Sequence, residues 1–122
     1  MKNVTVLFVD DEENLLNTFK RLFRRESFKD LYASSGHEAL EILKSNRVDL
    51  MVTDQRMPRM NGMELYKKSR EQFVGLKVLL LSGDSDVTRH VAELGDKGLC
   101  GIYQKPIDHK KLLKIIYELT SN

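Results

Sequence analysis

The chain has 122 residues, 41% of them hydrophobic and 31% charged, which predicts one ordinary globular domain spanning 1–122 and argues against disorder. Its formal net charge at pH 7 is only +2, too small to indicate direct binding of nucleic acid. The apolar runs are too short to cross a membrane and no basic and apolar leader opens the chain, so we expect a cytoplasmic protein without direct membrane binding.

In chain order, apolar runs typical of buried strands alternate with amphipathic runs typical of helices. The predicted strands are Val4–Val9, Phe28–Ser34, Val48–Thr53, Leu76–Ser82 and Leu99–Gln104. The predicted helices are Glu12–Arg25, Gly36–Asn46, Met63–Phe73, Asp86–Leu94 and Ile107–Leu119. This alternation predicts the α/β class, a doubly wound five-stranded parallel sheet with helices on both faces.

Smaller signals refine this outline. Ser35 followed by Glu38 has the spacing of a capping box at the start of the second helix, and Gly95 fits the end of the fourth. The single cysteine, Cys100, has no partner for an internal disulfide, and its apolar neighbours predict a small core residue. The basic run Lys20–Glu26 has helical spacing and predicts a solvated helix face rather than a phosphate-binding patch.

Polar side chains stand at the carboxyl ends of four predicted strands. They are Asp10 and Asp11 after the first strand, Asp54 after the third, Ser82 at the end of the fourth and Lys105 after the fifth. Each alone has a plain explanation as a helix cap, a turn residue or a solvated side chain. Because all these strand ends share one edge of an open parallel sheet, where ligands bind, their convergence favours a functional site.

The charges at this edge indicate what it holds. Two carboxylates about 4 Å apart repel by roughly 4 kcal/mol at an effective dielectric constant near 20, so three acids require cations beside them. Asp10, Asp11 and Asp54 contribute −3 and Lys105 contributes +1, which leaves −2, the charge that one divalent ion offsets. Oxygen ligands without histidine or cysteine predict a hard ion, Mg²⁺. With Mg²⁺ and Lys105 neutralising a phosphoryl group, Asp54 is placed to attack phosphorus and form an aspartyl phosphate.

Four segments, "VLFVDDEENLL", "DLMVTDQRMPRMNGMEL", "LLLSGDSD" and "YQKPID", together resemble the receiver domain of bacterial two-component response regulators over essentially the whole chain. The resemblance implies a flavodoxin-like strand order 2-1-3-4-5. It also implies a signalling switch that takes its phosphoryl group from a sensor histidine kinase, a phosphotransfer domain or a small phosphodonor, and is not a turnover enzyme on external substrates. The altered surface at residues 83–119 would then regulate a target protein or an attached output domain, and phosphorylation would allow dimerisation.

Matched position by position, the resemblance assigns roles around the metal. Asp54 corresponds to the phosphoacceptor, Asp11 to a direct Mg²⁺ ligand, and Asp10 to an acid that acts on the ion largely through water. Arg56 corresponds to the position whose backbone carbonyl completes the protein ligands. Arg56 and Asp84 also occupy positions that influence the lifetime of the phosphoryl group in this family.

Ser82 corresponds to the hydroxyl that moves to the bound phosphoryl group, Lys105 to the lysine that pairs with it, and the Lys105–Pro106 bond is expected to be cis. The family usually has an aromatic switch residue three positions before this lysine. Here that position is Ile102 and the aromatic residue, Tyr103, comes one place later, which sends it to the opposite face of the strand. Either the aromatic switch is absent and Tyr103 is a packed aromatic, the interpretation we favour, or a bulge re-aims it.

Two other classes of protein fit less well. A phosphatase of the haloacid dehalogenase type resembles an Asp-x-Asp pattern after the first strand and needs a cap domain, whereas Asp10 and Asp11 are adjacent and we expect no cap. A flavodoxin-like or purely structural binding module would need a loop rich in Ser, Thr and Gly after the first strand. The segment "DDEENLL" is anionic and would repel phosphate without a metal.

Overall fold

A computed structural model describes residues 3–83 and 99–121. The elements are β1 (Thr5–Val9), α1 (Glu13–Phe23), β2 (Lys29–Ala33), α2 (Gly36–Ser45), β3 (Leu50–Asp54), α3 (Gly62–Gln72), β4 (Lys77–Ser82), β5 (Leu99–Gln104) and α5 (His109–Thr120). Each lies within two residues of the element predicted for it. The predicted helix Asp86–Leu94, its stop at Gly95 and Asp84 lie outside the described residues.

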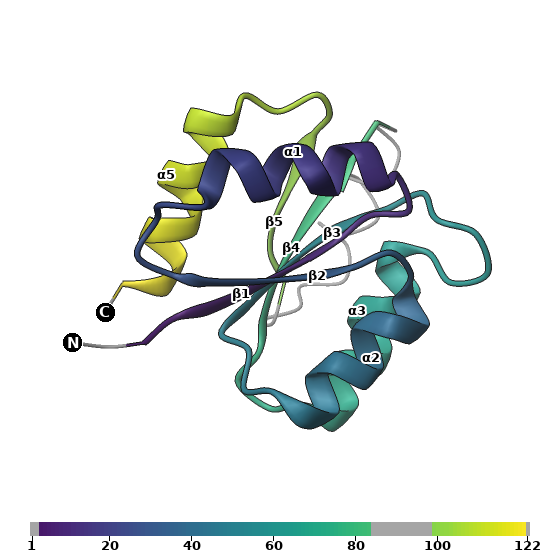
Figure 1. Ribbon diagram of the computed structural model, residues 1–122. Coiled ribbons are helices and arrows are strands. Elements are labelled where there is room, and N and C mark those ends of the chain that lie inside the picture. Colours follow the sequence, from purple (N-terminus) through teal and green to yellow (C-terminus); the bar gives the residue numbers. More distant parts are fainter. Residues whose placement is uncertain (1–2, 84–98, 122) are drawn as a thin grey trace.

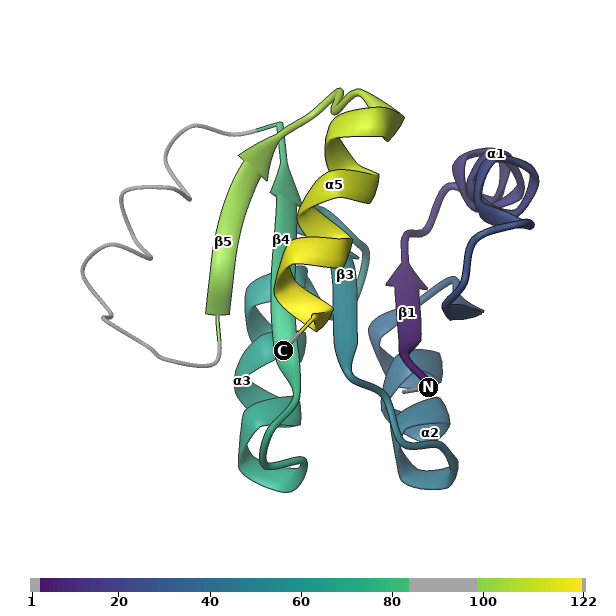
Figure 2. The same cartoon turned by 90° about the vertical axis from the view of Figure 1, so that its left-hand side faces the viewer.

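The five strands form one parallel sheet in the order β2-β1-β3-β4-β5, which confirms the predicted class and strand order. Helices α1 and α5 cover one face of the sheet, and α2 and α3 cover the other (Figure 1). The arrowheads of β1, β3, β4 and β5 point to the same edge, so the carboxyl ends of these strands come together there (Figure 2). None of the helices within residues 3–83 and 99–121 has both the length and the apolar character needed to cross a membrane.

The central strands are buried on both faces, as continuous apolar runs predict for a covered parallel sheet. Because side chains alternate along a strand, the sheet divides the core in two. Toward α2 and α3 lies a cluster rich in methionine, to which Met51, Met57, Met60 and Met63 contribute. Toward α1 and α5 lies an aromatic cluster centred on Phe8.

Phe8 is fully buried in β1 and contacts aromatic rings from three further segments. The distances between ring centroids are 5.3 Å to Phe19, 5.4 Å to Phe23, 6.4 Å to Phe28 and 5.4 Å to Tyr32. These separations lie in the range in which aromatic pairs stabilise each other beyond their buried area. The aromatic cluster therefore fixes α1 against β1 and β2.

Strand β5 departs from regular pairing near its start. Val78 pairs with Leu99 but the next residue, Leu79, pairs with Gly101, so Cys100 is skipped in the β4 register. Cys100 is half-buried, which corrects the prediction of a buried core residue, because β5 lies at the end of the sheet and all of Leu99–Tyr103 is only partly buried. Burial raises the pKa of its thiol.

Replacing Phe8 by Ala is expected to cost about 3–5 kcal/mol of unfolding free energy, since it removes a fully buried ring and leaves a cavity among four others. Urea unfolding followed by circular dichroism measures this change. Leu22 on α1 is 39% exposed and provides the control, because Leu22→Ala is expected to stay within about 0.5 kcal/mol of the native value. A Phe8→Ala loss no larger than the Leu22→Ala loss would contradict the role given to the aromatic cluster.

Candidate functional site

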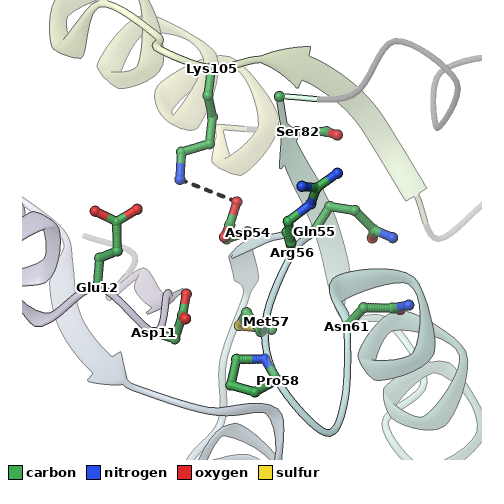
Figure 3. Close-up of a pocket in the computed structure, with 11 residues that line it drawn as sticks. Asp11, Glu12, Asp54, Gln55, Arg56, Met57, Pro58, Asn61, Ser82 and Lys105 are labelled. Atoms are coloured by element: carbon green, nitrogen blue, oxygen red, sulfur yellow. Dashed lines mark hydrogen bonds and ion pairs between the residues drawn. The ribbon is translucent and has the colours of Figure 1, made fainter.

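The predicted site residues meet in one pocket at the carboxyl edge of the sheet. Asp54 is the last residue of β3, Ser82 the last of β4, and Lys105 follows β5 directly. Figure 3 shows Asp11, Asp54, Ser82 and Lys105 around the same space. The pocket has a volume of about 850 Å³ and is lined by Asp11, Glu12, Asp54, Gln55, Arg56, Met57, Pro58, Asn61, Ser82, Gly83 and Lys105.

Lys105 joins two carboxylates that come from different strands. Its Nζ lies 3.2 Å from Asp10 Oδ2 and 3.2 Å from Asp54 Oδ1. Asp10 is 3% exposed and Asp54 is 7% exposed, whereas Asp11 is exposed. The other oxygen of Asp10, Oδ1, accepts a hydrogen bond of 2.9 Å from the backbone N–H of Glu12. One ammonium group therefore holds together the ends of β1 and β3.

The protonation equilibria of this group reflect burial and charge. Burial raises the pKa of Asp54 above its ordinary value, and although Lys105 opposes this shift, the nearby carboxylates of Asp10 and Asp11 add to it. Burial alone would lower the pKa of Lys105, but the carboxylates of Asp10 and Asp54 outweigh it and the net pKa is raised. Lys105 therefore stays positively charged while the acids beside it remain only partly compensated.

The acidic side chains fit a hard divalent cation. One carboxylate oxygen from each of Asp10, Asp11 and Asp54 lies within 4.8 Å of the others. All three donors are oxygen atoms, the ligand type that Mg²⁺ prefers. Their combined charge with Lys105 remains −2, so a cation would relieve the remaining repulsion.

The loop after Asp54 contains residues that the sequence analysis did not single out. Gln55 lines the pocket, and its side-chain Oε1 accepts a hydrogen bond of 2.9 Å from the backbone N–H of Met63 in α3. Asn61 caps α3 in a full capping box with Glu64. The Asn-x-x-Glu spacing is a readable signal for this cap and would have placed the helix start correctly. No comparable sequence pattern indicates the hydrogen bond between the Gln55 side chain and the Met63 amide.

Two other predictions for the site concern main-chain groups, the Lys105–Pro106 peptide bond and the carbonyl of Arg56. The Lys105–Pro106 peptide bond is cis, as the resemblance predicts. The side chain of Arg56 is exposed and lines the pocket, while the coordinating role expected of its carbonyl stays a prediction.

The two switch candidates lie on opposite faces of β5. Ile102 pairs with Leu80, whose side chain faces Gly62 of α3. Tyr103 packs against the aromatic cluster on the side of α1 and α5, with Lys111 Nζ 5.7 Å from its ring centroid. The skipped residue Cys100 precedes both, so the irregularity in β5 does not bring Tyr103 to the face of Ile102.

Comparisons with known proteins agree with this geometry. A family model described as the response regulator receiver domain matches residues 6–117. The putative two-component response regulator ARR21 of Arabidopsis thaliana is 33% identical over 121 residues, which is 98% of this chain and 19% of that protein. Sporulation initiation phosphotransferase F of Bacillus subtilis is 29% identical over 97 residues, 78% of each chain.

Solved structures give the same result. The response regulator protein TrrA from Thermotoga maritima, solved in complex with Mg(2+)-BeF, superposes with a TM-score of 0.83 at 25% identity. The match covers 95% of this chain and 98% of that one. The receiver domain of the hybrid histidine kinase CckA has a TM-score of 0.80 at 30% identity, with 96% of this chain and 99% of that chain covered. Against longer curated relatives the chain spans a small part, such as 26% of the transcriptional regulatory protein GlrR of Escherichia coli.

Without divalent cations, Asp54→Asn is expected to raise the melting temperature at pH 7–8. The pKa of Asp54 is higher in the folded than in the unfolded chain, so its protonated form favours folding, and this contribution is lost as the pH rises through the folded pKa. Asparagine has no carboxylate to ionise, so the variant does not lose this part of the folding stability as the pH rises. Thermal unfolding in EDTA measures the difference, which is expected to shrink as the pH falls toward 3.8, the ordinary value for this group. A variant less stable than the native chain at pH 8 would contradict this account.

Proposed function

We propose, from the premise that this chain belongs to the response regulator receiver domain family, that it is a phosphorylation-dependent signalling switch whose phosphoacceptor is Asp54. The observation that carries the proposal is the pairing of Lys105 Nζ with both Asp10 and Asp54 in the pocket that Ser82 also lines. Receiver domains are signalling domains rather than classical enzymes, and they bind Mg²⁺ at an acidic pocket. The three-aspartate cluster supplies such a pocket.

The residues that would hold Mg²⁺ are Asp11 and Asp54 directly, Asp10 largely through water, and Arg56 through its backbone carbonyl. When bound, Mg²⁺ supplies the positive charge that offsets the acids and the oxygens of an incoming phosphoryl group. The fit rests on the donor set, which consists of carboxylate oxygens within 4.8 Å of one another. Lys105 contributes the second positive charge and is fixed in place by its two ion pairs.

In the proposed transfer, an ionised Asp54 Oδ atom attacks the phosphorus atom of the donor. A P–O bond forms, the P–N bond of a phosphohistidine breaks, and its electron pair returns to the imidazole nitrogen, which takes up a proton. With acetyl phosphate, the bond that breaks is a P–O bond and acetate leaves. The product is an acyl phosphate whose oxygens Lys105 and the Ser82 hydroxyl, once turned toward Asp54, would bind.

The amides at the start of α3 are unsuited to bind that phosphoryl group. The backbone N–H groups of Gly62, Met63 and Glu64 already donate to Gln55 O, Gln55 Oε1 and Asn61 Oδ1. A helix N-terminus binds anions through amides that have no other partner. Among the side chains that line the pocket, Lys105 and Ser82 are the ones we propose to bind the phosphoryl oxygens together with the cation.

Receiver domains interact with histidine kinases or phosphotransfer proteins and with attached output domains. For this chain we infer a sensor histidine kinase or phosphotransfer domain as donor, an output through the 83–119 surface, a possible phosphorylation-linked dimer, and action in the cytoplasm. Ile102 occupies the switch position without a ring, and Tyr103 packs on the other face, which supports a packing role for Tyr103 rather than the usual aromatic switch.

Incubation with acetyl phosphate and Mg²⁺ is expected to add one phosphoryl group to the native chain, detected by intact mass. Asp54→Asn and samples in EDTA are expected to show no adduct, because the nucleophile or the counter-charge is missing. Asp49, which accepts a hydrogen bond from the Thr5 amide outside the pocket, offers a control, and Asp49→Asn should still be phosphorylated. An adduct that persists in Asp54→Asn would reject Asp54 as the phosphoacceptor.

Addition of Mg²⁺ is expected to raise the melting temperature of the native chain, because a ligand that binds only the folded state stabilises it by about 2.7 kcal/mol at 100 times its dissociation constant. Asp11→Asn should lose most of this shift, since Asp11 is a proposed direct ligand of the cation in the three-aspartate cluster. Asp108→Asn changes an exposed acid outside the pocket and should keep the shift. Equal shifts in the two variants would argue against a metal site at these aspartates.

A further inference from the structure

Gln55, the residue that follows Asp54, makes three hydrogen bonds to two other elements. Its backbone N–H donates to Leu81 O at 2.8 Å, which extends the pairing of β3 with β4 by one residue. Its backbone carbonyl accepts from Gly62 N at 2.9 Å, and its side-chain Oε1 accepts from Met63 N at 2.9 Å. The side chain runs from the loop toward the start of α3 (Figure 3). Gln55 is thus the junction of β3, β4 and α3.

The two bonds to α3 come from one residue and end on consecutive amides. The main-chain carbonyl takes the first amide of the helix, and the side-chain carbonyl takes the second. Met63 is 8% exposed and its hydrogen bond to Gln55 Oε1 is part-buried, so loss of that oxygen would leave the amide without a protein partner and with restricted access to water. An unpaired buried amide is costly, and the start of α3 would shift to find another partner.

Such a shift would reach Asp54 through Gly62. A Cβ atom built on Gly62 would lie 2.5 Å from the carbonyl oxygen of Asp54 and 3.0 Å from Gln55 Cα. The first turn of α3 therefore rests directly on the backbone that carries the Asp54 side chain. Movement of this turn changes the Asp54 peptide and with it the direction in which the carboxylate points toward Lys105.

We propose that Gln55 is a positioning residue for phosphoryl transfer: its side-chain amide, by holding the Met63 N–H, fixes α3 against Asp54 and so orients the Asp54 carboxylate. This inference rests on the proposed function. A misplacement of about 1 Å at a reacting atom is enough to cost up to about a hundredfold in rate. Gln55 lines the same pocket as Lys105 and Ser82, while the hydrogen bonds described above join it to Leu81, Gly62 and Met63.

The test compares rates of phosphorylation by acetyl phosphate at saturating Mg²⁺, followed by intact mass. Gln55→Met keeps the length of the side chain but removes the carbonyl, and its rate constant is expected to fall at least about fivefold. Gln55→Ser also removes the carbonyl, but its smaller side chain leaves room for a water molecule to accept from the Met63 amide, so this variant is expected to fold. Because water does not hold α3 in place, its rate is expected to fall as well. Gln55→Glu restores an acceptor at a helix N-terminus, where negative charge is favourable, but adds a charge to the pocket lining, so its rate is expected to exceed that of Gln55→Met without reaching the native rate.

Ser35→Ala is the matched control, because it removes the same kind of bond, a side-chain oxygen accepting from a helix amide (Glu38 N, 3.1 Å), at the start of α2. It is expected to lose similar stability and keep the native rate. A native rate in Gln55→Met or Gln55→Ser, a Gln55→Glu rate as slow as theirs, or an equal slowing in Ser35→Ala would overturn the inference. Failure of the native chain to take a phosphoryl group would instead overturn the proposed function, so the two failures are distinct.

Discussion

The ion pairs of Lys105 are the constraint on which the rest of the site depends. Three carboxylates converge at the sheet edge, two of them nearly removed from water, and such a group does not stay ionised without positive charge among its members. Lys105 supplies that charge with Nζ 3.2 Å from an oxygen of Asp10 and from one of Asp54. Because these acids end different strands, the same contacts that moderate their repulsion also fix the carboxyl ends of β1 and β3 relative to the segment after β5.

The sheet and its two core clusters hold these charged residues in place. A parallel sheet covered by helices on both faces sends the carboxyl ends of its strands to one edge, and the apolar strands β1, β3 and β4 hold that edge rigid. The methionine-rich cluster lies under α2 and α3, and the aromatic cluster under α1 and α5. The polar residues thus stand at the rim of a close-packed core, which limits how far any one of them can move.

Much of this follows from local sequence pattern. The alternation of strands and helices, the convergence of Asp10, Asp11, Asp54, Ser82 and Lys105, and the oxygen-only donor set are readable because each depends on residue type and on position at a strand end. What the sequence did not reveal depends on three-dimensional approach. The hydrogen bond between the Met63 amide and Gln55 Oε1 joins a loop residue to a helix start, where no periodic pattern applies, and the contact of Gly62 with the Asp54 carbonyl appears only once α3 is packed. The apolar neighbours of Cys100 predict a core residue, but Cys100 is half-buried like the rest of Leu99–Tyr103, because β5 is an edge strand of the sheet.

The remaining charge of the pocket has a consequence for how information passes through it. With Lys105 counted, the aspartates leave the site at −2, and the amides of the first turn of α3 are already bonded, so a phosphodonor, itself an anion, meets repulsion from an empty pocket. Under the proposed function, entry of the donor would therefore depend on prior or simultaneous entry of a cation. If the proposed function holds, the site would then respond only when donor and cation are present together, and neither alone would produce an output. The concentration of cation needed for this response would then depend on the charges of Asp10, Asp11, Asp54 and Lys105.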